Sequence, residues 1–126
     1  YGLAFREELV QEGAYSLELG AAALGELHRQ GVTAIAAGSD LIAWGICRAA
    51  RRMGLSIPED LSVTGYGDTA VSAGMEVPLT SVSVHFDRIA RKAVNLIRHR
   101  EGLSPETITP TLICRESTQK PKEMVL

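Results

Sequence analysis

Aromatic side chains are scarce in this sequence, because only 5% of its 126 residues are Phe, Trp or Tyr. Proteins that bind single-stranded nucleic acids stack bases on aromatic rings, so this composition argues against that class. Basic residues form no long block either, and 13 Lys and Arg against 15 Asp and Glu give a net charge of −2. We therefore do not expect these residues to bind DNA by themselves.

Long apolar runs are also missing from the chain. No stretch approaches the roughly 18 consecutive apolar residues that a membrane-spanning helix needs. Charged residues interrupt the apolar pattern of residues 1–15, which end in no small-residue cleavage site, so they do not resemble a signal peptide. The default expectation is a cytoplasmic protein without a membrane partner.

The residues that usually carry catalysis or metal binding form no recognisable motif. Cys47 and Cys114 lie far apart in apolar segments, and we expect both to be buried thiols rather than a disulfide. G-x-S-x-G, P-loop and H-E-x-x-H motifs are absent, and His28, His85 and His99 are scattered. The prediction is a protein that is not an enzyme and needs neither a metal nor a cofactor.

Apolar periodicity predicts alternating helices and strands. The expected helices are Leu3–Glu12, Ser16–Arg29, Leu41–Met53 and Phe86–Arg100, and the expected strands are Val32–Ala37, Leu61–Tyr66, Leu79–Val84 and Ile108–Arg115. Residues 67–78 are expected to form a loop with at most one turn of helix. Strands that alternate with helices of this length indicate an α/β fold with a parallel sheet covered on both faces.

Individual strands carry further predictions. Val32–Ala37 is almost entirely apolar, which is typical of a central strand buried on both faces. Leu79–Val84 alternates apolar and hydroxyl residues and predicts a strand with one wetter face. Because Pro110 has no amide hydrogen, either the last strand lies at a sheet edge or Pro110 stands at the beginning of that strand.

Ligands of such folds bind beyond the carboxyl ends of the strands, and two segments occupy that position. Gly65-Tyr66-Gly67-Asp68 matches part of a dinucleotide-binding fingerprint, but the segment after it is too short for the required crossover helix. The other segment is Gly38-Ser39-Asp40, in which either Ser39 or Asp40 can cap the helix that follows. The carboxylate of Asp40 is the candidate for a second role. It could also accept hydrogen bonds from a hydroxylated ligand, and the residues alone leave both roles open.

Three segments of the chain form a recognisable series: AIAAGSDLIAWGICRAARRMGLSIPEDLSVTGYGD, VPLTSVSVHFDRIARKAVNLI and PTLICREST. In order and spacing they resemble the carboxyl-terminal part of the LacI/GalR family of bacterial transcription regulators. The resemblance implies a parallel-sheet, three-layer lobe of a periplasmic-binding-protein-like domain. In the family, a small molecule, often a sugar or nucleobase, binds between two such lobes, and a separate helix-turn-helix, unmatched here, binds operator DNA.

The resemblance also implies how the chain is organised. Residues 1–84 would form the carboxyl-terminal lobe, and 85–103 a helix that crosses to a first lobe, which the sequence does not match. Residues 104–118 would return as the last strand, and 119–126 form a loose tail. The strand and loop that the family has near Gly13 and Ser16 are not recognisable. An apolar helix over 85–103 without its lobe would promote association, so we expect a longer protein or an obligate oligomer.

Site residues follow from the same resemblance. Asp40 matches the aspartate of the family's N-D motif, which usually contacts the effector, and Ser39 replaces the common asparagine. Asp68 matches the second acid of the G-[YF]-D-D motif, in which Gly67 replaces the first. Further expected effector contacts are Phe86, Val84 and Tyr1, the last at the position of a common arginine.

The helix Leu41–Met53 is apolar around more of its circumference than a one-sided helix needs. In the family, the matching helix lies at the dimer contact, which implies a homodimer interface at Trp44, Ile46, Cys47 and Ala50. A helix sandwiched within one chain would explain the same pattern. The leading hypothesis is the effector-sensing and dimerisation part of a transcription regulator, and the alternative is a solute-binding protein of sugar transport.

Overall fold

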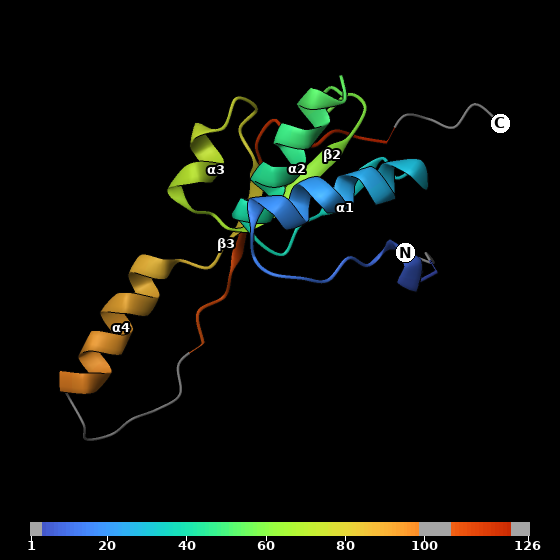
Figure 1. The fold of residues 1–126 in the computed structure, drawn as a ribbon. Coiled ribbons are helices and arrows are strands. Elements are labelled where there is room, and N and C mark those ends of the chain that lie inside the picture. The colour runs from blue at the N-terminus through green and yellow to red at the C-terminus, as the bar shows by residue number, and fades with distance from the viewer. Residues whose placement is uncertain (1–3, 99–106, 122–126) are drawn as a thin grey trace.

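A computed structural model describes residues 4–98 and 107–121 of the chain (Figure 1). Its helices and strands follow in the order η1 (Glu7–Leu9), α1 (Leu17–Arg29), β1 (Ala34–Ala36), α2 (Asp40–Arg52), β2 (Ser62–Gly67), α3 (Ala70–Gly74), β3 (Thr80–Ser83), α4 (Phe86–Arg98) and β4 (Thr111–Ile113). Tyr1, a predicted effector contact, lies outside the described residues.

The strands form one sheet in the order β1-β2-β3-β4. β1, β2 and β3 are parallel, with Gly65 opposite Ser81, while β4 runs antiparallel to β3. The predicted α/β fold with a mainly parallel sheet is therefore confirmed, as is the edge position of the strand that follows Pro110. The prediction of a central first strand is wrong, because β1 lies at the other edge of the sheet and its Ala34 and Ala36 are exposed.

Serine caps and glycine turns set the limits of the two long helices. The hydroxyl oxygen of Ser16 accepts a hydrogen bond from the Leu19 amide at the start of α1, and Ser39 does the same for Ile42 at the start of α2. These bonds satisfy amides that have no partner within the helix. α2 ends before Gly54, whose φ of +73° is easily adopted only by a residue without a Cβ.

α2 packs against the sheet, and α1 packs against α2. Two glycines allow the helices to approach, because a Cβ on Gly20 would overlap the Ile42 carbonyl oxygen and a Cβ on Gly45 that of Leu17. The core between these layers consists of Leu24, Ala43, Ile46, Ala49, Ala50, Leu61, Val63 and Leu79. This packing holds the amino-terminus of α2 at the carboxyl edge of the sheet.

Four local predictions are corrected by the tertiary structure. Of the expected helix Leu3–Glu12, residue 3 lies outside the described residues, and residues 4–12 contain only the short η1. None of the residues of η1 is buried, and short helices without a packed face are only marginally stable. The sheet face opposite α2 carries no helix within the described part of the chain. The hydroxyl residues of β3 are buried, although a solvent-exposed face was expected. Cys114 is exposed, although a buried thiol was expected.

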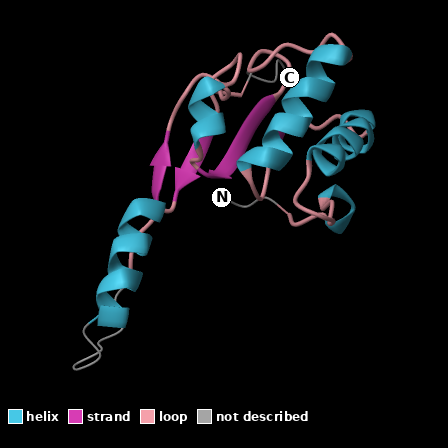
Figure 2. Ribbon diagram, turned by 60° about the vertical axis from the view of Figure 1, so that its left-hand side comes forward, coloured by secondary structure: helices cyan, strands magenta, loops and turns pink. Residues whose placement is uncertain are grey.

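α4 extends away from the sheet (Figure 2), and none of its described residues is buried. Its apolar side chains remain exposed, including Phe86, Ile89, Val94, Leu96 and Ile97. The predicted stripe is therefore present and uncovered, and the expected last residues of this helix, 99–100, lie outside the described part. Among the described residues, no helix is long and apolar enough to span a membrane.

Candidate functional site

The carboxyl ends of the parallel strands converge on the first turn of α2, where Asp40 is only 1% exposed. The local sequence explains this arrangement. Ser39 has an extended backbone and caps α2, so Asp40 is the first helical residue. Of the two roles left open for Asp40, side-chain capping is therefore taken by Ser39. The carboxylate of Asp40 turns instead toward the neighbouring strands.

Three hydrogen bonds hold the buried carboxylate. Oδ2 of Asp40 accepts bonds from the Thr69 amide at 2.6 Å and from the Thr69 hydroxyl at 2.9 Å. Oδ1 accepts a bond from the Ser81 hydroxyl at 2.5 Å. A buried charge is tolerated only when such donors replace water, and the amino-terminus of α2 favours the negative charge as well. Asp40 thus ties α2 to β3 and to the loop that follows β2.

Gly65 of β2 makes room for this carboxylate, and Gly67 lies close to it. A Cβ on Gly65 would overlap Oδ1 of Asp40 and crowd the Leu79 side chain. A Cβ on Gly67 would lie 3.7 Å from Oδ2 of Asp40 and 3.8 Å from the Phe86 ring. Of the glycines that first suggested a dinucleotide fingerprint, Gly65 therefore serves the packing of an aspartate, whereas Gly67 adopts a φ of +121° and a Cβ there would make only ordinary van der Waals contact with Asp40 and Phe86.

Asp68 continues the same cluster behind Asp40. Its amide donates to the Ser81 hydroxyl oxygen at 3.1 Å, and its carboxylate forms an ion pair of 2.7 Å with Arg115. Burial raises the pKa of the Asp68 carboxyl, but the hydrogen bond and the charge of Arg115, together with the Ser72 hydroxyl, outweigh that effect, so that the pKa is lowered. Asp68 is therefore held as a carboxylate with its charge balanced inside the protein.

The remaining predicted effector residues surround this cluster with different exposures. Ser39 and Val84 are half-buried, whereas Phe86 is 58% exposed. The structure thus brings Asp40, Asp68 and Phe86 together at one edge. Both carboxylates of the cluster are engaged by protein donors.

Sequence reasoning missed Thr69, Ser81 and Arg115, which hold the two aspartates. The alternating hydroxyls of β3 were an available signal, but we interpreted them as a wet face. Arg115 stands in the quoted segment PTLICREST without a role. Its partner Asp68 is 47 positions away, so local spacing could not have joined them.

The predicted dimer residues divide into two groups. Ile46 is 1% exposed and Ala50 is also buried, both within the chain's own core, so the structure withdraws them from any partner surface. Trp44 and Cys47 are half-buried and line a hollow of about 340 Å³ with Arg48, Arg51, Met75, Glu76 and Val77. The Arg48 guanidinium lies 5.9 Å from the Trp44 ring centroid, within cation–π range.

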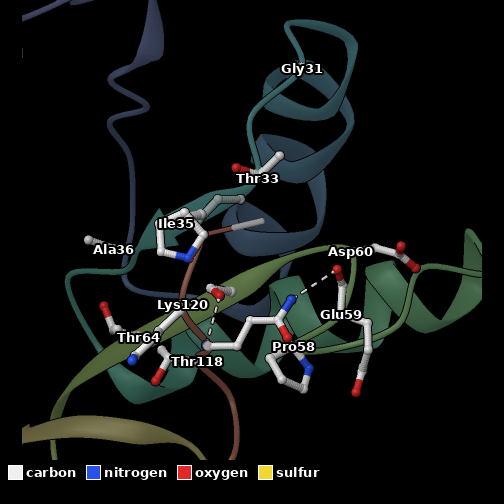
Figure 3. A pocket seen from close by; sticks show the side chains of 14 residues that line it. Gly31, Thr33, Ile35, Ala36, Pro58, Glu59, Asp60, Thr64, Thr118 and Lys120 are labelled. Atoms are coloured by element: carbon white, nitrogen blue, oxygen red, sulfur yellow. Dashed lines mark hydrogen bonds between the residues drawn. The ribbon is translucent and has the colours of Figure 1, made fainter. Parts of the chain in front are cut away.

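A larger hollow of about 930 Å³ lies elsewhere, over β1, β2 and the segment 118–121 (Figure 3). Ala34, Ala36, Ser62 and Thr64 line it, and these side chains alternate with the ones that face α2. It contains none of the predicted effector residues. Because parallel sheets are normally covered on both faces, we interpret it as an uncovered sheet face rather than as a ligand pocket.

Comparison with known proteins places this geometry in a family. The family model described as a periplasmic-binding-protein-like domain matches residues 1–118. The transcriptional regulator MalR of Streptomyces coelicolor is 37% identical over 117 residues, which cover 89% of this chain and 34% of that protein. The chain belongs to the LacI/GalR family. It spans about a third of the length of its curated LacI/GalR relatives.

Solved LacI/GalR structures share the fold. A transcription regulator of Lactobacillus plantarum superimposes with a TM-score of 0.86 at 29% identity, covering 92% of this chain and 47% of that one. A LacI family regulator of Enterococcus faecium, solved with bound ribose, gives a TM-score of 0.79 at 25% identity, covering 89% and 44%. The curated LacI/GalR relatives are regulators of transcription, and the fold is that of a periplasmic-binding-protein-like lobe.

Proposed function

We propose that this chain supplies the effector-sensing and dimerisation surfaces of a LacI-type transcription regulator. The observation that carries the proposal is the buried cluster around Asp40, which fixes the carboxyl edge of the sheet where α/β folds bind ligands. In the proposal, the effector shifts the population between open and closed arrangements of two lobes. Operator DNA would be bound by a separate amino-terminal domain.

The proposed effector surface consists of Ser39, Val84, Phe86 and the loop at Asp68, together with Tyr1. Phe86 offers an exposed ring next to polar groups, a combination typical of small-molecule sites. Asp40 would affect effector binding indirectly, by orienting Thr69 and the first turn of α2. This assigns Asp40 a positioning role within the site that the family resemblance implies.

A sugar-like metabolite is the effector class that we propose. Hydroxyl-rich ligands need both hydrogen-bonding groups and an apolar surface, and this edge combines serine and threonine hydroxyls with an exposed phenyl ring. The solved Enterococcus faecium regulator that resembles this chain contains ribose, which supports the class without identifying the compound.

A thermal-shift screen of neutral sugars, with ribose included, tests this proposal on the full-length gene product. A sugar at 100 times its Kd should stabilise the protein by about 2.7 kcal/mol. Phe86→Ala should abolish the response, while Phe5→Ala, at a residue 83% exposed and remote in sequence from this edge, should preserve it. An equal response of the Phe86→Ala protein, or no response to any sugar, would contradict the proposal.

Homodimerisation is proposed through the outer face of α2, at Trp44 and Cys47. The hollow beside these residues and the Arg51–Glu76 ion pair at 2.6 Å give that face both apolar and charged elements. Trp44→Glu should convert a dimer to a monomer in sedimentation velocity. Val71→Glu, on the exposed part of α3, is the control, and an unchanged dimer in Trp44→Glu would remove this surface.

α4 is proposed to cross to the other lobe, as the family resemblance implies for residues 85–103. Its uncovered apolar stripe supports this role, because such a stripe gains free energy only when another surface removes it from water. The strand that begins the return, β4, lies beside β3, so both crossing segments meet the same part of the sheet.

A further inference from the structure

Arg115 joins β4 to the loop that follows β2. It is the second residue after β4, and its side chain is 20% exposed. One guanidinium nitrogen donates to Oδ1 of Asp68 at 2.7 Å, and the other donates to the Leu79 carbonyl oxygen at 2.7 Å and the Ser72 hydroxyl at 3.3 Å. One side chain thus contacts the loop, α3 and the start of β3.

The main chain of Arg115 is itself firmly anchored. Its amide donates to the Thr80 hydroxyl oxygen at 2.9 Å, and its carbonyl oxygen accepts from the same hydroxyl at 3.2 Å. Two residues later, the buried Ser117 hydroxyl donates to the Val63 carbonyl oxygen at 2.6 Å and accepts from the Thr80 amide at 2.8 Å. The segment that carries Arg115 is therefore hydrogen-bonded to both β2 and β3.

The loop that Arg115 contacts has an unfavourable backbone. Asp68 has a φ of +51°, in the left-handed region that is unfavourable for a residue with a Cβ. Such a conformation persists only when surrounding bonds hold it. The ion pair with Arg115, the bond from the Asp68 amide to Ser81 and a 3.2 Å bond from the Ser72 hydroxyl to Oδ1 of Asp68 are contacts that hold it.

We propose that Arg115 is a positioning residue for the effector edge. It holds Asp68 in its left-handed conformation, which keeps Thr69 directed at Asp40 and Ser81 between the two aspartates. The importance of this edge for ligand binding rests on the proposed function, whereas the positioning itself does not. Because Arg115 follows the segment that returns from α4, it also links that segment to the edge.

Hydrogen–deuterium exchange of the full-length gene product tests the proposal. Peptides covering 66–73 report amide exchange in the loop, and peptides covering 20–29 report amide exchange in α1. Arg115→Gln and Asp68→Asn should each accelerate loop exchange by about ten-fold or more, as expected for loss of a charge-assisted bond, with a much smaller change in α1. The double variant should add little to either single change.

Arg51→Gln is the matched control, since it removes an exposed ion pair with Glu76 just beyond α3. Arg115→Lys keeps the charge but replaces the two donating guanidinium nitrogens by a single ammonium, so an intermediate acceleration is expected. This variant serves if Arg115→Gln does not fold. Equal acceleration of both peptides, or none in the loop, would overturn the inference. Failure of every sugar to bind would remove the proposed function and leave this result standing.

Discussion

The Ser81 hydroxyl donates a 2.5 Å hydrogen bond to the buried carboxylate of Asp40, 41 positions away in the sequence. The same hydroxyl oxygen accepts the Asp68 amide, so a single serine side chain connects two acidic residues. β3 supplies the serine, α2 one aspartate and the turn after β2 the other. The candidate site is therefore a product of three elements that pack together.

Ser81→Ala should lower the free energy of unfolding by about 1–3 kcal/mol, because it leaves Oδ1 of Asp40 and the Asp68 amide without this partner. Urea denaturation measures the change. Ser56→Ala, at an exposed serine, should change stability by less than about 0.5 kcal/mol. Equal effects of the two substitutions would show that the buried bond is unimportant.

Gly65→Ala should destabilise the protein by about 1–3 kcal/mol, because the added methyl group overlaps Oδ1 of Asp40 and crowds Leu79. Gly25 lies within α1 with open space at its Cβ position, so Gly25→Ala should stabilise by about 0.5–1 kcal/mol. Thermal denaturation of both variants distinguishes a steric requirement from a general effect of glycine replacement. A stable Gly65→Ala protein would argue against the close approach.

The Asp68–Arg115 pair should make stability depend on pH in the acid range. The pKa of Asp68 is lowered in the folded protein, so the pair contributes fully above the unfolded-state pKa of about 4. That contribution is lost as pH falls through the folded-state value. Asp68→Asn should therefore be less stable than the parent protein at pH 7, and the difference in stability should shrink as the pH is lowered below about 4. A constant difference across this range would contradict the assignment.

Two isoleucines should differ sharply when each is replaced by alanine. Ile46→Ala should cost about 2–5 kcal/mol, because it leaves a cavity between α1, α2 and the sheet. Ile97 is 73% exposed on α4, so Ile97→Ala should change the stability of residues 1–126 by less than about 0.5 kcal/mol. Chemical denaturation of that polypeptide measures both. A large loss from Ile97→Ala would mean that α4 is packed in solution.

The two thiols should differ in reactivity toward iodoacetamide. Burial raises the pKa of the Cys47 thiol to about 11, so little thiolate is present at pH 8, while Cys114 is exposed. Mass spectrometry should find Cys114 labelled first and Cys47 labelled only slowly. Equal labelling would show that α2 opens readily around Cys47.

Local patterns predicted much of the fold correctly. The expected helices Ser16–Arg29 and Leu41–Met53 match α1 and α2 to within one residue at each end, because apolar periodicity depends on residues a few positions apart. The same reasoning failed for residues 3–12, which have an amphipathic pattern but little to pack against. It failed again at β3, since alternation shows which side chains share a face and not what covers that face.

The candidate site was predicted only in part. Asp40 and Asp68 were identified through the family resemblance, but their mutual connection through Ser81 was not. Ile46 and Ala50 were assigned to a dimer surface because an apolar helix pattern does not distinguish a partner chain from the chain's own sheet. The exposure of Trp44 and Cys47 could be assigned only after α2 had been placed between α1 and β2.

The sequence by itself determined the α/β class, the order of its main elements and the limits of α1 and α2 to within one residue, because periodicity is a property of neighbouring residues. Only the tertiary structure decided that β1 is an edge strand, that the hydroxyls of β3 are buried and that Arg115 reaches Asp68. These outcomes depend on contacts between segments that are far apart in the sequence. Such contacts, and the burial that they cause, exist only in the packed molecule.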